Sequence, residues 1–170
     1  VQEKLEPAIF SFDVLLKFID YLDNKKVATA YPIHIEIDSG MHRLGFEAST
    51  LPRLLKLLKK HQKTLFVKGI FSHLAVSDIQ SQDDYSHRQA QVFEYCATAI
   101  EKALQQSCIK HLLNSAGIQH LSNYQYDMVR LGIGIYGYDA HKQLDKLENV
   151  LNFKSSISQI KDLKKGARLG

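Results

Sequence analysis

The 170-residue chain carries 22 basic and 18 acidic side chains, a formal net charge of +4 at pH 7, and 45% hydrophobic residues. This composition is typical of one globular domain; it argues against a disordered or collagen-like chain and predicts neither a nucleic-acid nor a membrane partner. The sequence contains no apolar run near the ~18 residues of a membrane span and no signal-peptide pattern. Cys96 and Cys108 lie in or beside apolar-periodic stretches without zinc-ligand spacing. We therefore expect buried, reduced thiols in a cytoplasmic protein.

Short apolar runs alternate with helical patterns along most of the chain. Continuous or alternating apolar residues predict strands over 8–12, 32–38, 65–72, 109–113 and 128–136. Apolar residues at helical spacing predict a helix that is capped by Asp13, followed by helices over 49–62, 83–106 and 116–121. Strands that alternate with helices indicate a parallel sheet with right-handed crossovers.

The fold class expected is therefore α/β. A closed (β/α)₈ barrel needs about 250 residues, so five strands are interpreted as the later part of a TIM-like barrel. An open doubly wound sheet is the alternative, although no glycine-rich phosphate turn follows the first strand. We assign 1–140 to this partial barrel, 141–150 to a polar linker and 151–170 to the start of a C-terminal β-domain, because 152–163 alternates. Without an initial methionine or a polar tail, the chain is expected to be a piece of a longer protein.

Polar residues follow four consecutive predicted strands. In parallel barrels the carboxyl ends of the strands meet at one mouth, where the functional site lies. The backbone N–H groups of Gly132 and Ile133, with the Ser115 hydroxyl, would form a phosphate cradle, and two arginines could hold further anionic groups. No clustering of metal-ligand type is visible, which favours a phosphorylated organic cofactor over a metal. The candidates are Glu36, Arg43, His73, His111, Asn114, Ser115, Arg130, Gly132 and Ile133.

Each candidate also has a purely structural interpretation. His73 could be an ordinary hydrogen-bonded residue, and Asn114 could simply cap a short helix. Arg43 and Arg130 could form salt bridges, with Glu36 or Asp127 as partners. The glycines near Ile133 could serve close packing between a strand and a helix. The structural interpretation weakens for the whole set, because all candidates fall on the same side of the sheet.

Four strings carry a resemblance to a known family: residues 35–46 (IEIDSGMHRLGF), 72–75 (SHLA), 113–116 (LNSA) and 129–137 (VRLGIGIYG). In sequence, order and spacing they closely resemble alanine racemase, a pyridoxal-phosphate-dependent family of fold type III. The resemblance covers essentially all 170 residues, with 157–161 leading into the family's C-terminal β-domain. It implies pyridoxal 5′-phosphate in the mouth of an N-terminal (β/α)₈ barrel, and a homodimer in which the partner's β-domain completes the site.

The resemblance also implies roles for individual residues. Arg130 would hydrogen-bond the pyridine nitrogen and keep it unprotonated, because two adjacent cations are disfavoured. His111 would orient Arg130, and His73 would link Arg130 to a tyrosine base from the partner subunit. Arg43 would lie near the phenolic oxygen of the cofactor and bind the substrate carboxylate. The residues implied to hold or flank the phosphate are Asn114, Ser115, Gly132 and Ile133.

Two departures from the family pattern stand out. Glu36 occupies a position where the family often has a lysine, commonly carbamylated; a glutamate supplies the same charge with a shorter reach, and a plain salt bridge is the alternative. The family's cofactor-binding lysine and its tyrosine base are expected outside these 170 residues. We therefore expect the isolated segment to be inactive.

The activity implied for the whole protein is interconversion of L- and D-alanine, which supplies D-alanine for peptidoglycan. The Cα proton would leave one face of the substrate and return on the other. The alternatives are a racemase for another amino acid and a non-catalytic pyridoxal-phosphate carrier of the same barrel family. A basic interaction module around Lys56 and Lys161 is a further alternative. A fusion of the parent polypeptide to a Mur-type peptidoglycan ligase also stays open.

Overall fold

A parallel sheet forms the centre of the molecule, in a computed structural model that describes residues 4–139 and 147–166. Its spatial order is β1-β2-β4-β5, and every adjacent pair is parallel. A short further strand, β3, pairs with the end of β2. The strands are β1 (Ala8–Ile9), β2 (Tyr31–Asp38), β3 (Phe46–Glu47), β4 (Leu65–Phe71) and β5 (Ile109–His111).

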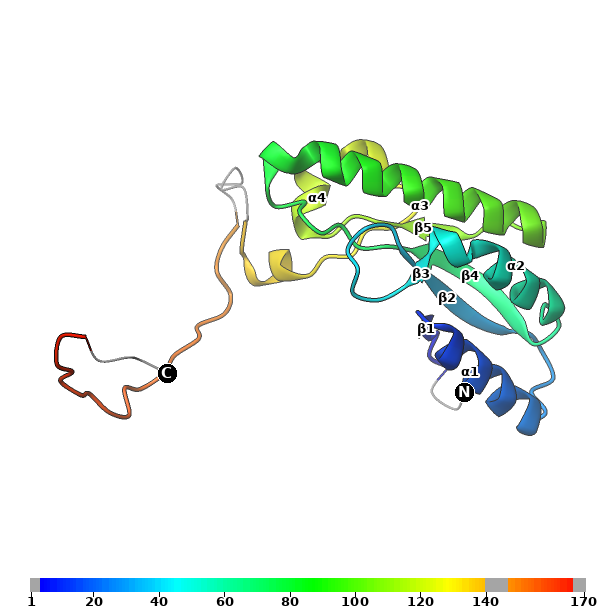
Figure 1. Ribbon diagram of the computed structural model, residues 1–170, viewed down its shortest axis with the longest axis horizontal. Coiled ribbons are helices and arrows are strands. Elements are labelled where there is room, and N and C mark those ends of the chain that lie inside the picture. Colours follow the sequence, from blue (N-terminus) through cyan, green and yellow to red (C-terminus); the bar gives the residue numbers. More distant parts are fainter. Residues whose placement is uncertain (1–3, 140–146, 167–170) are drawn as a thin grey trace.

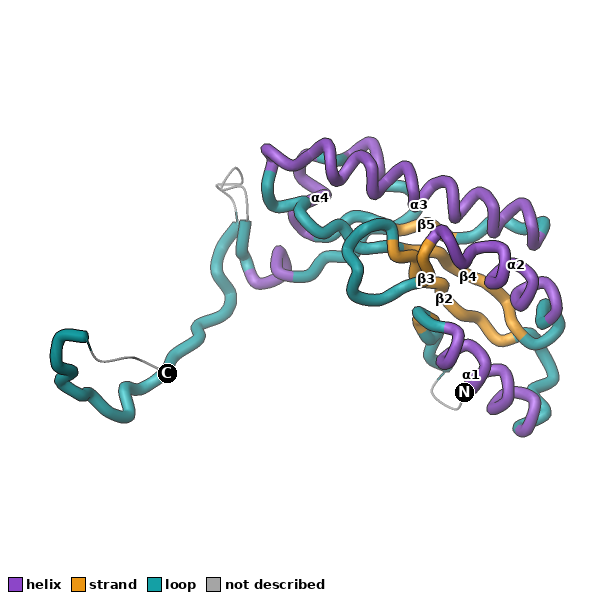
Figure 2. The backbone as a smooth tube through the Cα atoms, in the orientation of Figure 1, coloured by secondary structure: helices purple, strands orange, loops and turns teal. Residues whose placement is uncertain are grey.

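The helices alternate with these strands along the chain, as predicted (Figure 1). One helix follows β1, the next leads from β3 to β4, and the longest leads from β4 to β5. Figure 2 shows these helices beside the strands, with the polypeptide after residue 147 extending away from them as loop. The helices are α1 (Phe12–Asn24), α2 (Leu51–Lys60), α3 (Asp83–Leu104) and α4 (Ser115–His120).

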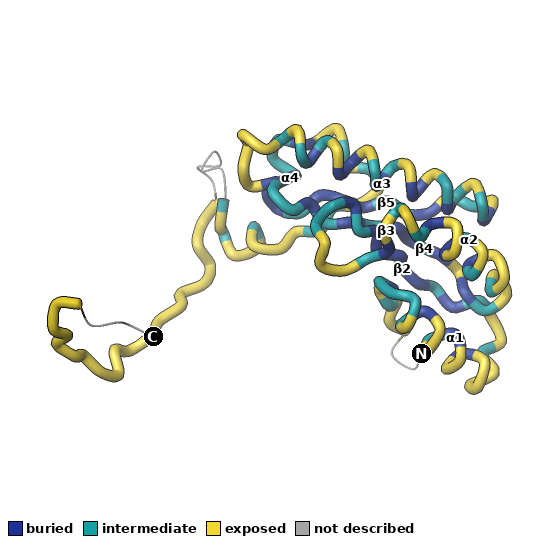
Figure 3. Tube along the Cα trace, viewed as in Figure 1, coloured by how far each residue is buried: buried dark blue, intermediate teal, exposed yellow. Residues whose placement is uncertain are grey.

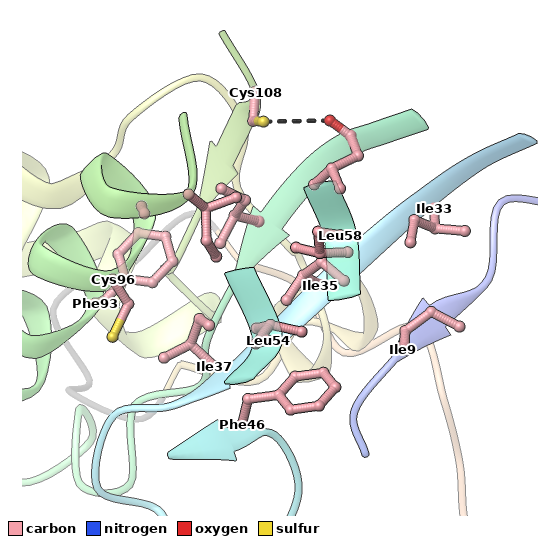
Figure 4. Close-up of a cluster of buried hydrophobic side chains, with 14 of the residues drawn as sticks. Ile9, Ile33, Ile35, Ile37, Phe46, Leu54, Leu58, Phe93, Cys96 and Cys108 are labelled. Carbon is pink, nitrogen blue, oxygen red and sulfur yellow. Dashed lines mark hydrogen bonds between the residues drawn. The ribbon is translucent and has the colours of Figure 1, made fainter. Parts of the chain in front are cut away.

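The hydrophobic core fills the space between the sheet and the helices. Alternate residues of β2 are fully buried and contribute to this core, which follows from the period of two in a strand. Figure 4 shows them near the buried side chains of α2 and α3. The labelled residues are Ile9, Ile33, Ile35, Ile37, Phe46, Leu54, Leu58, Phe93, Cys96 and Cys108.

Both cysteines are free and buried, as the sequence predicts. Burial raises the pKa of the Cys96 thiol to about 11. The Cys108 thiol donates to the carbonyl oxygen of Val67 at 3.2 Å (Figure 4). These thiols therefore act as small core residues, in an un-ionised form.

An irregularity between β2 and β4 sets which polar residues share a face. The register shifts between Ile33 and His34, so that His34 pairs with Gly69 and Lys68 is the extra residue. Beyond this bulge, Glu36 pairs with Phe71, and Phe71 pairs with His111 of β5. Paired residues project to the same side of a sheet. The polar residues of β2 and β5 thus gather opposite the apolar face that packs on the helices.

The first helix begins two residues before the position predicted from sequence. Ser11 is the N-cap, and its hydroxyl accepts the Val14 N–H at 3.3 Å. Asp13, predicted as the cap, lies in the first turn and forms an exposed ion pair with Lys17. Serine and aspartate cap helices equally well, so their order alone could not decide between them.

The strand predicted over 128–136 is wrong. Only one isolated parallel bridge forms there, between His111 and Met128, and Ile133–Tyr136 is a 3₁₀ turn. The backbone N–H groups of Gly132 and Gly134 donate to the Ser115 hydroxyl instead of to a neighbouring strand. The apolar pattern was therefore correct about proximity to the sheet and wrong about the backbone conformation.

The strand predicted over 152–163 is also absent. These residues have no regular secondary structure and are exposed along their whole length (Figure 3). Phe153, Ile157 and Ile160 are 94%, 80% and 81% exposed. A strand needs a partner for its backbone groups, and residues 4–139 offer none to this segment. Part of the predicted linker, residues 141–146, lies outside the described residues, as does residue 140.

Candidate active site

A pocket of about 440 Å³ opens where β4 and β5 end. It contains six of the nine residues predicted from sequence. Three of these six come from the segment after Met128, which forms only an isolated bridge and no strand. Met41 and Tyr138 add apolar surface to the pocket. The six predicted residues in its lining are His73, Asn114, Ser115, Arg130, Gly132 and Ile133.

The guanidinium of Arg130 is the most heavily bonded group at this site. Nη1 donates to the Nδ1 atom and the carbonyl oxygen of His111, at 2.8 and 2.9 Å. Nη2 donates to the carbonyl oxygens of Ser72 and Leu112, at 2.6 and 3.3 Å, and reaches Nδ1 of His73 at 3.5 Å. Four of the five guanidinium hydrogens are thereby engaged. The fifth, on Nε, has no partner among the described residues.

Both histidines around Arg130 are held in the neutral form. Burial, reinforced by the positive charge of Arg130, lowers the pKa of His111 to about 3. Burial also lowers the pKa of His73, with the charges of Arg130 and Arg43 adding to the effect. Because a guanidinium only donates, the Nδ1 atoms that face Arg130 must be the unprotonated nitrogens of both rings.

Ser115 connects the fourth helix to the turn after Arg130. Its hydroxyl oxygen accepts the N–H groups of Gly132 and Gly134, at 2.9 and 3.1 Å. With two donors already on the oxygen, the hydroxyl hydrogen remains to donate to a further group. The predicted cradle residues do lie together, but the Gly132 N–H is engaged with Ser115 rather than open.

Asn114 does what its structural interpretation predicts. It is the N-cap of α4, and its side-chain oxygen accepts the Gly117 N–H at 3.0 Å. The same oxygen accepts the hydroxyl of Ser77 at 2.8 Å. Ser77 is buried and also lines the pocket. Ser77 was not among the predicted residues, because it lies well beyond the end of β4 and no sequence motif marks it.

Arg43 lies on a tight loop after β2 and is exposed. The carboxylate of Asp38 accepts the backbone N–H groups of Gly40 and His42, at 2.9 and 3.0 Å. Gly45, with φ +114°, lets the loop fold back against the end of β2. A Cβ atom at this position would lie 2.5 Å from the backbone nitrogen of Asp38. The loop is thus fixed by Asp38 and Gly45, whereas Arg43 does not line the pocket.

Glu36 is buried on β2 and interacts electrostatically with both arginines. Burial raises the pKa of its carboxyl, and the attraction of Arg43 and Arg130 offsets this only in part. Neither arginine forms an ion pair within 4 Å with Glu36 or Asp127 in the described ranges. Asp127 instead accepts the backbone N–H of Lys110 at 2.8 Å. The simple salt-bridge interpretation of the arginines is therefore wrong.

The arrangement can bind an anionic, aromatic-sized ligand through a fixed cation and a serine hydroxyl. Among residues 4–139 and 147–166, no group of three or more His, Cys, Asp or Glu side chains is placed to hold a metal ion. No helix in these ranges has the length and hydropathy of a membrane-spanning segment.

The parallel sheet, its alternating helices and the polar site at the strand ends define part of a TIM-like α/β barrel. Residues 1–140 match the family model described as alanine racemase, N-terminal domain. The chain belongs to the alanine racemase family.

Individual relatives agree with this assignment. "Alanine racemase 2" of Caldanaerobacter subterraneus subsp. tengcongensis is 39% identical over 137 residues, which cover 77% of this chain and 34% of the relative. The alanine racemase of Syntrophobacter fumaroxidans is 30% identical over 174 residues, covering 100% of this chain and 45% of the relative. The chain thus spans less than half the length of these relatives.

Solved structures show the same fold. The alanine racemase of Bartonella henselae with covalently bound pyridoxal phosphate superposes with a TM-score of 0.73 and 27% identity, covering 87% of this chain and 41% of that one. The Clostridium difficile alanine racemase in complex with cycloserine superposes with a TM-score of 0.70 and 28% identity, covering 84% of this chain and 39% of that one.

Proposed function

We propose that the full-length protein is a pyridoxal 5′-phosphate-dependent alanine racemase and that this segment supplies the cofactor-binding part of its barrel. The family membership supports the reaction, and the relative with covalently bound pyridoxal phosphate supports the cofactor. The pocket at the strand ends is the place where a barrel enzyme of this class binds its ligand.

The structural observation that best supports the proposal concerns Arg130. Its Nε–H is the one guanidinium hydrogen without a partner in the described residues. Arg130 lines the pocket while its two Nη atoms are fixed by His111, Ser72, Leu112 and His73. A cation held in this way can donate one hydrogen bond to an aromatic nitrogen and disfavours protonation of that nitrogen. This residue set fits the pyridine end of the proposed cofactor.

The other predicted residues have roles that follow from their contacts. The Ser115 hydroxyl has a hydrogen to donate to a phosphate oxygen, and Ile133 brings a backbone N–H group beside it. The Gly132 N–H holds the Ser115 oxygen in place. Asn114 fixes the first turn of α4 next to them. His73 presents its Nε2–H as the donor left over after Arg130 occupies Nδ1, which suits a link between Arg130 and the tyrosine of a partner subunit.

Arg43 and Glu36 are proposed to take part in binding the substrate. Arg43 is an exposed cation on a fixed loop and suits recognition of the carboxylate of alanine. Glu36 supplies the negative charge that attracts Arg43. When bound, pyridoxal phosphate would supply the electron-withdrawing ring that makes the Cα–H bond of the amino acid acidic. The lysine and tyrosine that move this proton are proposed to lie outside the segment, so the segment alone is inactive.

The broader assignments rest on further features of the chain. We place residues 1–140 in the later part of the barrel and 151–170 at the start of a β-domain. Exposed Phe153, Ile157 and Ile160 favour burial of this second region in the whole protein or in a homodimer. Two free buried thiols fit the reducing cytoplasm, where D-alanine would be made for peptidoglycan.

The proposal is tested with the full-length protein. Loaded with pyridoxal phosphate and given L-alanine, it should form D-alanine until the two enantiomers are equal, measured by chiral chromatography. The R130A variant should lose this activity, whereas D13A, which changes an exposed residue outside the pocket, should keep it. Turnover of serine but not alanine would favour the racemase for another amino acid. Bound cofactor without any racemisation would favour the carrier protein.

A further inference from the structure

We infer that Glu6 and His34 are positioning residues for Arg130, which they hold through His111 in a hydrogen-bond relay that crosses the sheet. The inference rests on the proposed function, because it assigns to the relay the task of fixing a guanidinium that faces the cofactor. The relay is defined as Glu6, His34, His111 and Arg130. None of these contacts except that of His111 with Arg130 was predicted from the sequence.

The relay is continuous in the structure. Arg130 Nη1 lies 2.8 Å from His111 Nδ1, and His111 Nε2 lies 3.0 Å from His34 Nδ1. His34 Nε2 lies 3.2 Å from a carboxylate oxygen of Glu6. The second carboxylate oxygen of Glu6 accepts a hydrogen bond from the ammonium group of Lys68. The relay therefore runs from the half-buried cation of Arg130 to the anion of Glu6, beside the edge strand β1.

The chemistry of the two ends fixes every proton between them. A guanidinium has no acceptor, so Nδ1 of His111 must be unprotonated, and the neutral His111 carries its hydrogen on Nε2. That hydrogen points to His34 Nδ1, which must accept it. His34 then carries its own hydrogen on Nε2 and donates it to Glu6, an acceptor only. Both imidazoles are held in the same Nε2–H tautomer, and an imidazolium at His34 would break the contact with His111.

The backbone makes room for this relay at one glycine. His34 pairs with Gly69 across the bulge between β2 and β4. A Cβ atom on Gly69 would lie 2.2 Å from His34 Nδ1 and 2.5 Å from its Cε1 atom. Any side chain at position 69 would therefore displace the imidazole from His111. Gly69 and the bulge are therefore both needed to place His34 against His111.

Phe71 supports the middle of the relay. Its ring stacks on His111, with centroids 4.9 Å apart and an angle of 5° between the planes. The Cζ atom of Arg130 lies 5.2 Å from the centroid of the same ring. His111 is thus fixed in its plane by stacking and in its rotation by hydrogen bonds on both ring nitrogens. Its remaining freedom is small, and so is that of the guanidinium it holds.

The first test measures the tautomers directly. The full-length protein is labelled with ¹⁵N-histidine, and long-range ¹H–¹⁵N correlation spectra at neutral pH distinguish protonated from unprotonated ring nitrogens. H34Q and H111Q variants assign the two rings. We expect both His34 and His111 to bear hydrogen on Nε2 alone. An Nδ1–H tautomer in either ring, or a doubly protonated His34, would overturn the relay. This readout does not depend on activity.

The second test separates the relay from the neighbouring ion pair. E6A removes the acceptor of His34, whereas K68M removes the other partner of Glu6 and leaves the relay intact. For E6A we expect kcat to fall roughly 10-fold while KM for alanine changes by less than about 2-fold, as when a group that positions the reacting atoms is loosened. K68M should match the parent enzyme, and E6Q, which keeps an acceptor oxygen, should recover most of the loss.

The outcomes distinguish the relay from the proposed function. Correct tautomers in a protein that does not racemise alanine would contradict the function and support the relay. Racemisation with equal losses in E6A and K68M would contradict the relay and leave the function standing. If E6A fails to fold, the comparison of E6Q with G69A decides: the glycine variant should lose the His34 Nε2–H signal, and an unchanged spectrum would overturn the inference.

Discussion

Arg130 is the residue on which both the site and its electrostatics depend. Lysine would keep the positive charge but bring three donors on one atom, which cannot reach the acceptors that now surround the planar guanidinium. In the full-length protein we expect R130K to lower kcat roughly 100-fold, the cost typical of a reacting geometry displaced by about 1 Å. Steady-state kinetics measure this. A lysine variant as fast as the parent would show that charge alone suffices.

Glu36 and Asp38 both lie on β2, and their pKa values shift in opposite directions. Burial raises the pKa of Glu36. Burial also acts to raise the pKa of Asp38, but hydrogen bonds from the His42 and Gly40 N–H groups outweigh it and lower this pKa. An acid with a raised pKa in the fold destabilises it once ionised, so its cost appears as pH rises through the unfolded and then the folded pKa.

The two carboxyls therefore predict opposite pH dependences. E36Q should raise the urea midpoint at pH 7, and the gain should vanish as pH falls below 4.5, the ordinary pKa of a glutamate in an unfolded chain. D38N should lower the midpoint at pH 7, and this loss should shrink as pH falls from 3.8, the ordinary value for aspartate, through the lower folded pKa. Urea unfolding of both variants across the range from neutral to acidic pH measures the difference. Parallel curves for the two variants would contradict the assignment.

At the residue scale, the rule that functional sites lie at strand ends identified several residues of the candidate site. It found His111 and Ser115, because His111 ends β5 and Ser115 begins α4. It also found Arg130, although this residue follows an isolated bridge and not a strand. It could not find His34, which lies in the middle of β2 and contacts His111 only because a bulge and Gly69 allow it. Such a contact between residues 77 positions apart leaves no local pattern in one sequence.

The N-cap of α1 offers a test at the scale of an element. Ser11 accepts the Val14 N–H, and S11A would leave this half-buried group without its partner. We expect a loss of about 1 kcal/mol in the free energy of unfolding, the usual cost of a lost cap. Chemical denaturation measures it. S11D should restore the stability because aspartate also caps, and an S11A variant as stable as the parent would contradict the assignment of Ser11.

Periodicity located most elements, because each has an apolar face that packs on the sheet. The predicted ranges of the helices that became α2 and α3 differ from the observed ones by only a few residues. Periodicity failed over 128–136, where the Gly132 and Gly134 N–H groups donate to Ser115 and not to a strand. It failed again over 152–163, because residues 4–139 offer this segment no strand to pair with. An apolar pattern indicates only that a segment has a face suited to burial. A strand also needs a neighbouring strand that pairs with its backbone groups.

At the scale of the whole molecule, the exposed apolar residues of 151–163 predict a difference between the segment and the full-length protein. In the full-length protein we expect their amide hydrogens to exchange slowly, because the β-domain would pair and cover them. In the isolated segment the same amides should exchange fast. Hydrogen exchange followed by mass spectrometry compares the two. Equally fast exchange in both would contradict the assignment of 151–170 to a β-domain.

The central claim is that this segment forms the cofactor pocket of an alanine racemase. Full-length protein is incubated with pyridoxal phosphate and L-alanine in deuterated water, and both D-alanine and Cα deuterium are followed by NMR and mass spectrometry. Proton removal on one face and return on the other predicts that D-alanine appears carrying deuterium at Cα. If the cofactor binds and alanine keeps both its configuration and its Cα proton, the account is contradicted.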